Sequence, residues 1–402
     1  MERLLIKLNN KQAIVISKSV FVDLLEISHI KEYKDYIKAI DQNEITFINL
    51  KKLATKAGVP YPLFFAPKHI VDKQIENKDK NLYEKIPSKE EIRLSSRGRI
   101  EVKDIELIAK DLGRKQEFLK NRVLLKADPN KFIGSVGDKI KKNIPVEEIA
   151  TEIREYLGID LIYLRSIPKD KVLNYITTCS EKKGILISFS SYNYMPQNIN
   201  PELELSGICI KDKKFPYIFI NTRDGDEKPK IIESAGRQIF TLLSMLAFIG
   251  MGKFLLSSKS GRSKNDPIKL AYAIAGEIII PQSDLNTFKI TTLDELKERA
   301  HFFKITPSML LYKLEGQRKI GAVLANSFRQ QLQQDLRKAE PKQKRAPHPT
   351  TGYGKYNGLR FSKEIINAYR TGLISQVEVK NILFRQGKMD GKIFNDYNQK
   401  YN

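Results

Sequence analysis

Several residue types that carry common chemistry are scarce in this chain. Its 402 residues include no tryptophan and only two cysteines, Cys179 and Cys209, with no Cys-x-x-Cys pair. This excludes a disulfide framework and is typical of a reducing cytosol. The four histidines lie far apart and none stands four positions from another: His29, His69, His301 and His348. We therefore expect neither a metal centre nor a cofactor, because helical zinc sites need histidines on one helical face.

Long hydrophobic runs are also missing. The first residues, Met1-Glu-Arg-Leu-Leu-Ile-Lys, contain no apolar stretch of signal-peptide length. The best candidate for a membrane span, residues 239–254, is interrupted by polar residues and is shorter than the ~20 apolar residues that a span needs. We expect this segment to be a buried core helix and the protein to be cytoplasmic, without membrane contact.

Acidic residues are outnumbered by basic ones. The chain has 70 Lys and Arg against 47 Asp and Glu, which gives a formal net charge of +23. A chain this basic is attracted to nucleic acids and other polyanions. The alternative is that the excess of lysine reflects only the coding bias of an AT-rich genome. With 41% hydrophobic and 29% charged residues, the composition is that of a soluble globular protein.

Hydrophobic periodicity divides the chain into successive regions. Five successive regions are expected. They are a helical unit, a charge-dense helical connector, a main α+β domain, a flexible basic linker with three prolines and a glycine-containing end, and a small helical unit: residues 1–67, 68–139, 140–337, 338–358 and 359–402. The spacing of apolar residues predicts helices in every part of the chain except the linker. The expected ranges are 20–40, 47–57, 100–112, 146–157, 236–255, 266–280, 293–303, 307–314, 361–371 and 376–384. Strand-like runs are expected at 161–164, 184–190, 205–211 and 217–221.

The most informative segment is Arg237-Gln-Ile-Phe-Thr-Leu-Leu-Ser-Met-Leu-Ala-Phe-Ile-Gly. It has the apolar lead-in of a zinc-peptidase helix. In such a helix, His-Glu-x-x-His places both imidazoles on one face for Zn²⁺, and the Glu polarises the bound water. Ser244, Met245 and Phe248 occupy these positions here, and none of them can replace the ligand or the base. We therefore expect that apolar side chains have turned the pocket into core, since unsatisfied polar groups there would be costly.

Further segments accompany this helix in a recognisable order. Strand-like runs begin at Gly184, Leu205 and Tyr217, and Ala275-Gly-Glu-Ile-Ile-Ile-Pro281 follows the helix. In this order the segments resemble the ImmA/IrrE-type metallopeptidase-like domain of bacterial and phage regulatory proteins. Residues 50–67 resemble the end of the helix-turn-helix module that often precedes that domain, and residues 353–383 resemble the extension that often follows it. The resemblance covers most of the chain.

The resemblance implies an α+β fold with a zincin-like peptidase core, in which a mixed sheet carries an apolar active-site helix between helical N- and C-terminal units. Of the acids and histidines that hold zinc in the family, only Glu277 survives as an acid. The alternative ligand positions, one or two turns earlier, hold Ile268 and Leu270. Glu277 and the substituted positions on the helix are therefore vestigial, and peptidase activity by the family mechanism is not expected.

Basic clusters are the candidate nucleic-acid contacts. The linker region carries Lys338, Lys342, Lys344, Arg345 and Lys355. The segment expected to be a recognition helix, residues 30–40, carries Lys31, Lys34 and Lys38, interspersed with acids. A flexible basic arm binds phosphates without sequence preference. The alternatives are a solvated tether for the arm and a packing module that no longer reads DNA for the N-terminal unit.

These observations predict a non-catalytic pseudopeptidase that is a regulatory or scaffolding protein of a phage, mobile-element, toxin–antitoxin or phage-defence system. Its expected partners are nucleic acid and a protein such as a repressor or a toxin or defence component, as the resemblance implies. One alternative is a metal-dependent endopeptidase of the ImmA/IrrE type that cleaves a repressor with a relocated site, Glu277 with Glu202, Glu204 or Asp284. Another is a structural part of a phage or nucleoprotein assembly. The sequence leaves the oligomeric state open.

Overall fold

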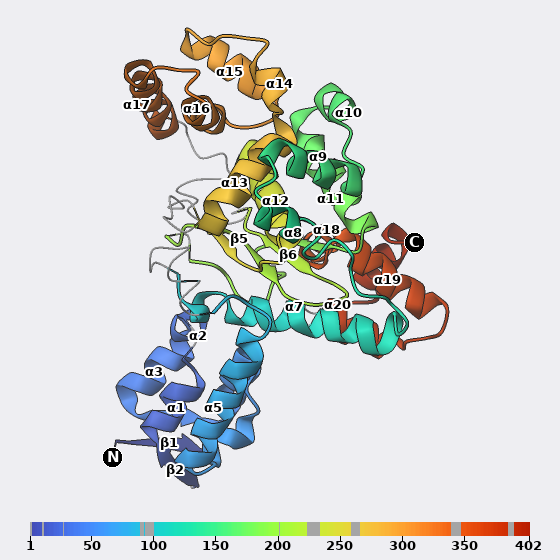
Figure 1. Ribbon diagram of the computed structural model, residues 1–402. Helices are drawn as coiled ribbons and strands as arrows, with labels where there is room; N and C mark the ends of the chain where they lie inside the picture. Colours follow the sequence, from blue (N-terminus) through green and yellow to red (C-terminus); the bar gives the residue numbers. More distant parts are fainter. Residues whose placement is uncertain are drawn as a thin grey trace.

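The computed structural model (Figure 1) describes residues 2–9, 12–26, 28–88, 92, 100–200, 202–222, 234–258, 266–338, 347–384 and 390–402. The protein is a mixed α and β structure in which helices predominate. Its buried apolar side chains form one cluster in the N-terminal unit and one on each face of a central sheet. Within the described ranges, no helix is long and apolar enough to cross a bilayer.

The N-terminal unit combines a small sheet with helices. Strands β1 (Arg3–Lys7), β2 (Ala13–Ser17) and β3 (Glu44–Thr46) pair in the order β2-β1-β3. The helical segments are α1 (Lys18–Leu24), α2 (Ser28–Lys31), α3 (Lys34–Gln42), α4 (Phe47–Ala57), η1 (Tyr61–Phe65) and α5 (Lys68–Tyr83). The expected purely helical unit is therefore wrong. Buried Leu4 and Ile6 alternate with exposed Arg3 and Lys7 in β1, which is strand periodicity.

The central sheet has the strand order β4 (Leu186–Phe189), β6 (Tyr217–Ile220), β5 (Leu205–Ile210), β7 (Leu256–Ser258). Strand β4 is parallel to β6, and β5 is antiparallel to both of its neighbours. Almost every residue of β4, β5 and β6 is buried, with no alternation of apolar and polar positions. This pattern requires that both faces of the sheet are covered.

The first face of the sheet is covered by long helices, three of which the sequence predicted and one of which, over residues 169–182, it missed. They are α9 (Val146–Leu157), α11 (Lys169–Lys182), α12 (Ala235–Gly250) and α13 (Asp266–Ile279), with the short α8 (Gly137–Lys141) and α10 (Leu161–Ser166) beside them. The strand expected at 161–164 is wrong, because Asp160 caps a helix there. Its Oδ1 accepts hydrogen bonds from the backbone N–H groups of Ile162 (2.7 Å) and Tyr163 (3.3 Å).

A helical lobe follows α13 at one end of the molecule (Figure 1, top). It consists of α14 (Gln282–Leu285), α15 (Leu293–Phe302), α16 (Pro307–Gly316) and α17 (Ala322–Lys338). The N-terminal unit lies at the opposite end of the view.

The second face of the sheet is covered by the connector and the C-terminal residues together. The segments are η2 (Val102–Asp104), α7 (Glu106–Phe118), the π-helical η3 (Leu119–Val123), α18 (Pro349–Asn357), α19 (Leu359–Arg370), α20 (Gln376–Leu383) and α21 (Gly391–Lys400). The expected flexible linker at 338–358 is wrong for residues 349–357, which form the helix α18. Tyr353 and Tyr356 of this helix are buried in the second core.

Buried hydrogen bonds join α18 to its neighbours. The Tyr217 hydroxyl of β6 donates to the Asn357 carbonyl oxygen (2.8 Å), and the Asn357 side chain donates to the Leu383 carbonyl oxygen (3.1 Å). The Tyr356 hydroxyl donates to Asp111 Oδ2 of α7 (3.0 Å). Because a buried polar group is costly unless it is paired, these bonds fix α18 in one position between the sheet and α20.

Glycine explains why α18 fits so closely. Gly358, the residue after α18, has φ +82° and ψ 156°, a conformation that is essentially restricted to glycine. A Cβ at this position would overlap the backbone carbonyl oxygen of Ile187 in β4. The run of glycines that favoured a flexible linker in the sequence therefore serves close packing instead.

We predict that Gly358→Ala destabilises the protein by about 3 kcal/mol or more, because it adds backbone strain to overpacking. Gly391→Ala is the matched control, since no atom lies within 4 Å of a Cβ there, and we expect a change within about 0.5 kcal/mol. Urea unfolding of both variants measures the difference. Equal stability of the two variants would show that α18 is not packed against β4 as described.

Glu181 of α11 lies at the junction between the first-face helices and α19. Its side chain is buried, and its Oε2 accepts a hydrogen bond from the backbone N–H of Arg360 (3.2 Å). The Arg360 guanidinium donates to the Glu181 carbonyl oxygen. Burial raises the pKa of the Glu181 carboxyl to about 7, although nearby backbone N–H groups and Arg360 favour the charged form.

This shift predicts a pH-dependent stability. The raised pKa means that the folded state binds a proton between the ordinary Glu value of 4.5 and about 7 while the unfolded state does not. The stabilisation is complete below 4.5 and is lost as pH rises through 7, by up to about 3 kcal/mol. We expect Glu181→Gln to remove this part of the pH dependence of the unfolding free energy. Parallel profiles for variant and wild type from pH 5 to 8 would contradict the assignment.

Candidate functional site

Helix α12, which carries the positions predicted to be vestigial, is an internal helix. It begins at Ser234, whose Oγ accepts a hydrogen bond from the backbone N–H of Arg237 (3.4 Å). It packs against β5 and β6 on one side and against α11 and α13 on the others. Every residue from 241 to 250 is buried. A helix that is apolar all round is a core helix, as the sequence predicted for this segment.

The three positions that would carry the zinc chemistry are fully enclosed. Ser244, Met245 and Phe248 each expose 0% of their surface. The Ser244 hydroxyl donates to the Phe240 carbonyl oxygen of the preceding turn (2.8 Å), which satisfies it within the helix. Met245 Sδ lies 3.6 Å from Cys209 Sγ of β5. These side chains therefore pack the core between the sheet and α13, as expected for a pocket that has been filled.

Glu277 of α13 has a basic partner. Its carboxylate is almost fully buried and forms an ion pair with Lys313 of α16. Its Oε2 also accepts a hydrogen bond from the backbone N–H of Gln282 (2.9 Å). Burial lowers the pKa of Lys313, and the adjacent Glu277 offsets only part of this decrease. Glu277 thus ties α13 to the helical lobe, and a buried pair of this kind needs both members to remain stable.

The residues proposed for a relocated metal do not form such a site in the described structure. Asp284 pairs with Arg165, as Glu277 does with Lys313. Glu202 is exposed and Glu204 is half-buried. Among the residues that the structure describes, no three His, Cys, Asp or Glu side chains converge as metal ligands would. The alternative positions on α13 are apolar, with Ile268 buried and Leu270 half-buried in the first core. These donors therefore do not fit a metal ion.

The thiols do not supply a nucleophile either. Cys179 and Cys209 are both free and buried. Burial raises the pKa of both thiols above the ordinary value. Thiolates are the reactive form of cysteine, so both are structural side chains.

The predicted nucleic-acid residues do not come together. Lys342, Lys344 and Arg345 lie outside the described residues. Lys338 is exposed at the end of α17, far from the N-terminal unit (Figure 1). Lys355 belongs to the buried helix α18, where its Nζ donates to Thr222 Oγ1 (2.8 Å) at the carboxyl end of β6. Its expected place on a flexible arm is therefore wrong.

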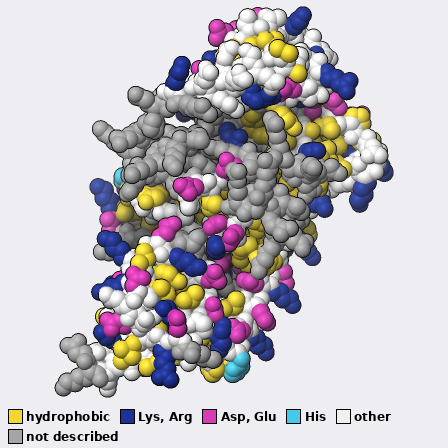
Figure 2. Space-filling model, turned by 90° about the vertical axis from the view of Figure 1, so that its left-hand side faces the viewer, with side chains coloured by type: hydrophobic (Ala, Val, Ile, Leu, Met, Phe, Trp, Pro, Cys, Tyr) yellow, Lys and Arg dark blue, Asp and Glu magenta, His cyan; other side chains and the backbone are white. Residues whose placement is uncertain are grey.

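In the N-terminal unit the predicted basic residues are partly engaged. Lys31 forms an ion pair with Glu26 (3.4 Å), whereas Lys34 and Lys38 are exposed one turn apart on α3. On the side of the molecule shown in Figure 2, Lys and Arg side chains are interspersed with Asp and Glu and do not form a single basic patch. An interspersed surface produces a weaker local field than a basic patch of the same net charge.

The sequence predicts α15 and α16 as two short helices joined by Lys304-Ile-Thr306, although it did not identify a helix-turn-helix there. The turn between them, residues 303–306, is short, and Lys304 within it has φ +62°. Thr306 precedes α16, and Pro307 occupies the first position of that helix. Proline is favoured at this position, so it marks where α16 begins. The two helices pack together, and α17 packs against α16. The side chains at their contact are buried: Leu296, Ala300, Phe303, Ile305, Leu310, Leu314 and Phe328. This is helix-turn-helix connectivity with a supporting third helix.

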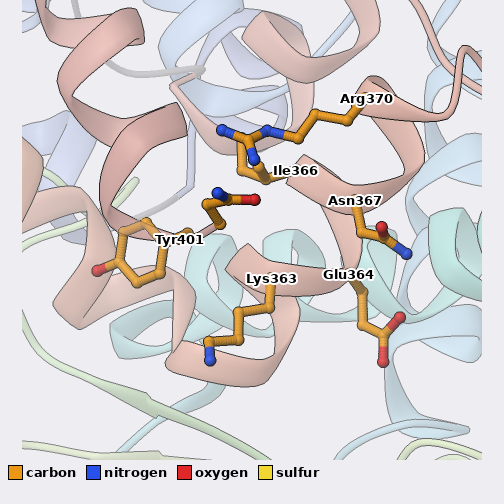
Figure 3. Close-up of a pocket in the computed structure, with 7 residues that line it drawn as sticks. Lys363, Glu364, Ile366, Asn367, Arg370 and Tyr401 are labelled. Carbon is orange, nitrogen blue, oxygen red and sulfur yellow. The ribbon is translucent and has the colours of Figure 1, made fainter.

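A shallow pocket of about 290 Å³ lies between α19 and the residues that follow α21, Tyr401 and Asn402 (Figure 3). It is lined by Lys363, Glu364, Ile366, Asn367, Arg370, Tyr401 and Asn402. Arg370 Nε donates to Asn398 Oδ1 (2.9 Å) and its Nη2 donates to the Asn398 carbonyl oxygen (3.0 Å), so this guanidinium holds α21 in place. The pocket is lined by the second-face helices, whereas α12 lies against the first face.

We predict that Met245→Glu, which restores the acid of the zinc-peptidase motif, destabilises the protein by about 3 kcal/mol or more, because it buries an unpaired carboxylate. Met245→Leu keeps the volume and the apolar character and should cost less than about 1.5 kcal/mol. Chemical unfolding of both variants measures the difference. A Met245→Glu protein as stable as Met245→Leu would show that position 245 is open to water.

The comparisons with known proteins add no relative. No protein-family model matches the chain, and neither a curated protein nor a solved structure is significantly similar to it. The resemblance to the ImmA/IrrE-type domain therefore rests on the order of the sequence motifs and remains a prediction.

Proposed function

We propose that this protein is a non-catalytic relative of the ImmA/IrrE-type metallopeptidases that works as a regulatory or scaffolding protein of a phage, mobile-element, toxin–antitoxin or phage-defence system. The observation that carries the proposal is the complete burial of Ser244, Met245 and Phe248. A catalytic zinc site needs three protein ligands and an open position for water or substrate. Neither the side chains nor the space for such a site is present on α12.

The arrangement of the central domain supports the proposed zincin-like origin. A mixed sheet carries α12 on one face, and α13 packs directly against α12. In the family that the sequence resembles, the corresponding helices carry the zinc ligands. In this chain, Glu277 of α13 forms an ion pair with Lys313 instead. The core thus retains a sheet and two helices that suit the resemblance, while their contacts are those of a packed interior.

The nucleic-acid part of the proposal is supported by the helical lobe. Its helix-turn-helix connectivity leaves an outer side of α16 exposed, where Tyr312 has 57% of its surface accessible and Ser308 is also exposed. In proteins with this motif, the second helix enters the major groove of DNA. Arg318 is exposed just beyond α16, and Lys338 is exposed at the end of α17. The net charge of +23 favours encounter with a polyanion.

The proposed protein partner and the proposed cytoplasmic location are supported by the sequence alone.

The relocated-metal endopeptidase is the second candidate, and the structure favours it less. Two of the acids that it would use, Glu277 and Asp284, already have basic partners. An ionised carboxylate in such a pair would have to leave a buried cation unpaired in order to bind a metal.

The experiment that tests the function is binding of the purified full chain to labelled duplex and single-stranded DNA over a series of salt concentrations. We expect duplex binding that weakens steeply with salt, because each phosphate contact releases counterions. Tyr312→Ala should weaken it about tenfold, which corresponds to about 1.4 kcal/mol. Tyr163→Ala is the matched control, since Tyr163 is similarly exposed on α10, at 51%, and should leave the affinity unchanged.

A variant with Lys342, Lys344 and Arg345 changed to Ala separates the two proposed nucleic-acid contacts. A smaller salt dependence in this variant, with the effect of Tyr312→Ala retained, would assign non-specific phosphate binding to the arm. Absence of binding by the wild type at low salt would contradict the nucleic-acid part of the proposal. Stoichiometric zinc in the purified protein, together with cleavage of a peptide substrate, would contradict the non-catalytic part.

A further inference from the structure

Strand β2 lies at an edge of the N-terminal sheet, with β1 on its other side. The residue pairing of β1 and β2 is antiparallel, with Leu4 opposite Ile16 and Ile6 opposite Ile14. The hairpin is extended at both ends, where the Lys18 N–H donates to the Glu2 carbonyl oxygen (3.0 Å) and the Leu8 N–H donates to the Gln12 carbonyl oxygen (2.9 Å). These bonds fix which residues of β2 face β1.

In an antiparallel ladder, hydrogen-bonded pairs recur at every second residue. Counting from the pairs at both ends of the hairpin, Ile14 and Ile16 direct their backbone groups toward β1. Ala13, Val15 and Ser17 therefore direct theirs outward, away from the sheet. Within the described ranges, no residue forms a backbone hydrogen bond with the outward groups of Ala13 or Val15. The edge is thus an open template for another strand.

The side chains of β2 are also unusual for an open edge. The strand reads Ala-Ile-Val-Ile-Ser and contains no charge, proline or glycine. Val15 exposes 55% of its surface and Ile14 exposes 39%, although Ile16 on the same face as Ile14 is buried. Edge strands that stay unpaired are normally protected by charges, prolines or bulges. The strand itself has none of these devices.

Two of the lysines that flank the edge are paired within the chain. Lys7 of β1 forms an ion pair with Glu44 (2.7 Å), and Lys18 forms one with Glu2 (3.3 Å). These pairs lower the positive charge beside the edge in a protein whose net charge is +23, and leave Arg3 of β1 as an exposed cation there. Two copies of this protein repel each other over most approaches, and paired charges beside an apolar edge reduce that repulsion.

We propose that β2 pairs with β2 of a second copy of this chain, antiparallel about a two-fold axis at Val15. In this register, the Val15 N–H of each copy donates to the Val15 carbonyl oxygen of the other. The Ser17 N–H donates to the Ala13 carbonyl oxygen of the other copy. The outward backbone N–H groups of one chain thus meet the outward carbonyl oxygens of the other. The combined sheet has the strand order β3-β1-β2-β2-β1-β3.

The sequence of the strand fits this symmetry. Read from either end, its centre is Ile-Val-Ile with a small residue on each side. The two-fold register places Ile14 of each copy opposite Ile16 of the other, in a pair without backbone hydrogen bonds, where side chains approach most closely. The exposed Ile14 would then join the apolar row of the core face. Because the strand complements itself, a second copy is a better occupant than an unrelated strand.

Sedimentation or light scattering of the full chain over a range of protein and salt concentrations tests the proposal. We expect a dimer that is strengthened by salt, because salt screens the repulsion between the copies. Val15→Lys places two like charges opposite each other on the axis and should weaken the dimer at least tenfold. Ile37→Lys is the matched control on α3, where Ile37 is 47% exposed, and should leave the dimer unchanged. Equal dimerisation of both variants, or a wild type that stays monomeric throughout, would overturn the proposal.

Hydrogen exchange of the wild type identifies the surface directly. The backbone N–H groups of Val15 and Ser17 should become protected as protein concentration rises, whereas those of Ile14 and Ile16, bonded to β1, should be protected at every concentration. Dimerisation without concentration-dependent protection of Val15 would assign the interface to another surface and overturn the proposal. This test is independent of the proposed function, since DNA binding weakens with salt whereas this dimer strengthens.

Discussion

The central sheet has apolar side chains on both faces, and those side chains leave water only if helices cover each face. This requirement organises most of the chain. Helices α9, α11, α12 and α13 cover one face, and α7 with α18 to α21 cover the other. The connector and the C-terminal residues, which the sequence suggested as separate units, are therefore parts of one central domain. The N-terminal unit has its own core.

The same requirement bears on the chemistry of α12. A helix enclosed by a sheet and two other helices can carry polar groups only if each finds a partner. In a zinc peptidase the metal and its water would supply such partners. In this chain Met245 and Phe248 fill the space and Ser244 bonds to its own helix. Glu277, the buried acid on the adjacent helix α13, is neutralised by Lys313 from the lobe. All four residues thus serve a packed interior. This is the basis for proposing a binding role for the protein.

The surfaces left for such a role lie at the two ends of the molecule (Figure 1). The helix-turn-helix lobe at one end exposes α16, and the N-terminal sheet at the other end exposes the edge of β2. A two-fold pairing through β2 would give an assembly with two copies of the lobe. Dimeric proteins that read DNA with helix-turn-helix motifs engage two half-sites in this way. The proposed dimer and the proposed DNA contact are therefore compatible, although each depends on different residues.

The sequence alone determined the local features that depend on short-range patterns. The helices at 47–57 and 146–157 have the predicted bounds, because apolar spacing and a following glycine mark both. The buried strands and the apolar character of α12 also followed from composition. Asp160 starts a helix where branched residues suggested a strand, through a local cap to Ile162 and Tyr163 that the strand prediction overlooked. Tertiary structure decided the rest. Gly358 allows α18 to pack where glycines and prolines suggested a linker. Tertiary structure also placed Lys355 against Thr222 at the end of β6 and packed α15, α16 and α17 together. These outcomes depend on partners distant in sequence, which periodicity and spacing do not identify.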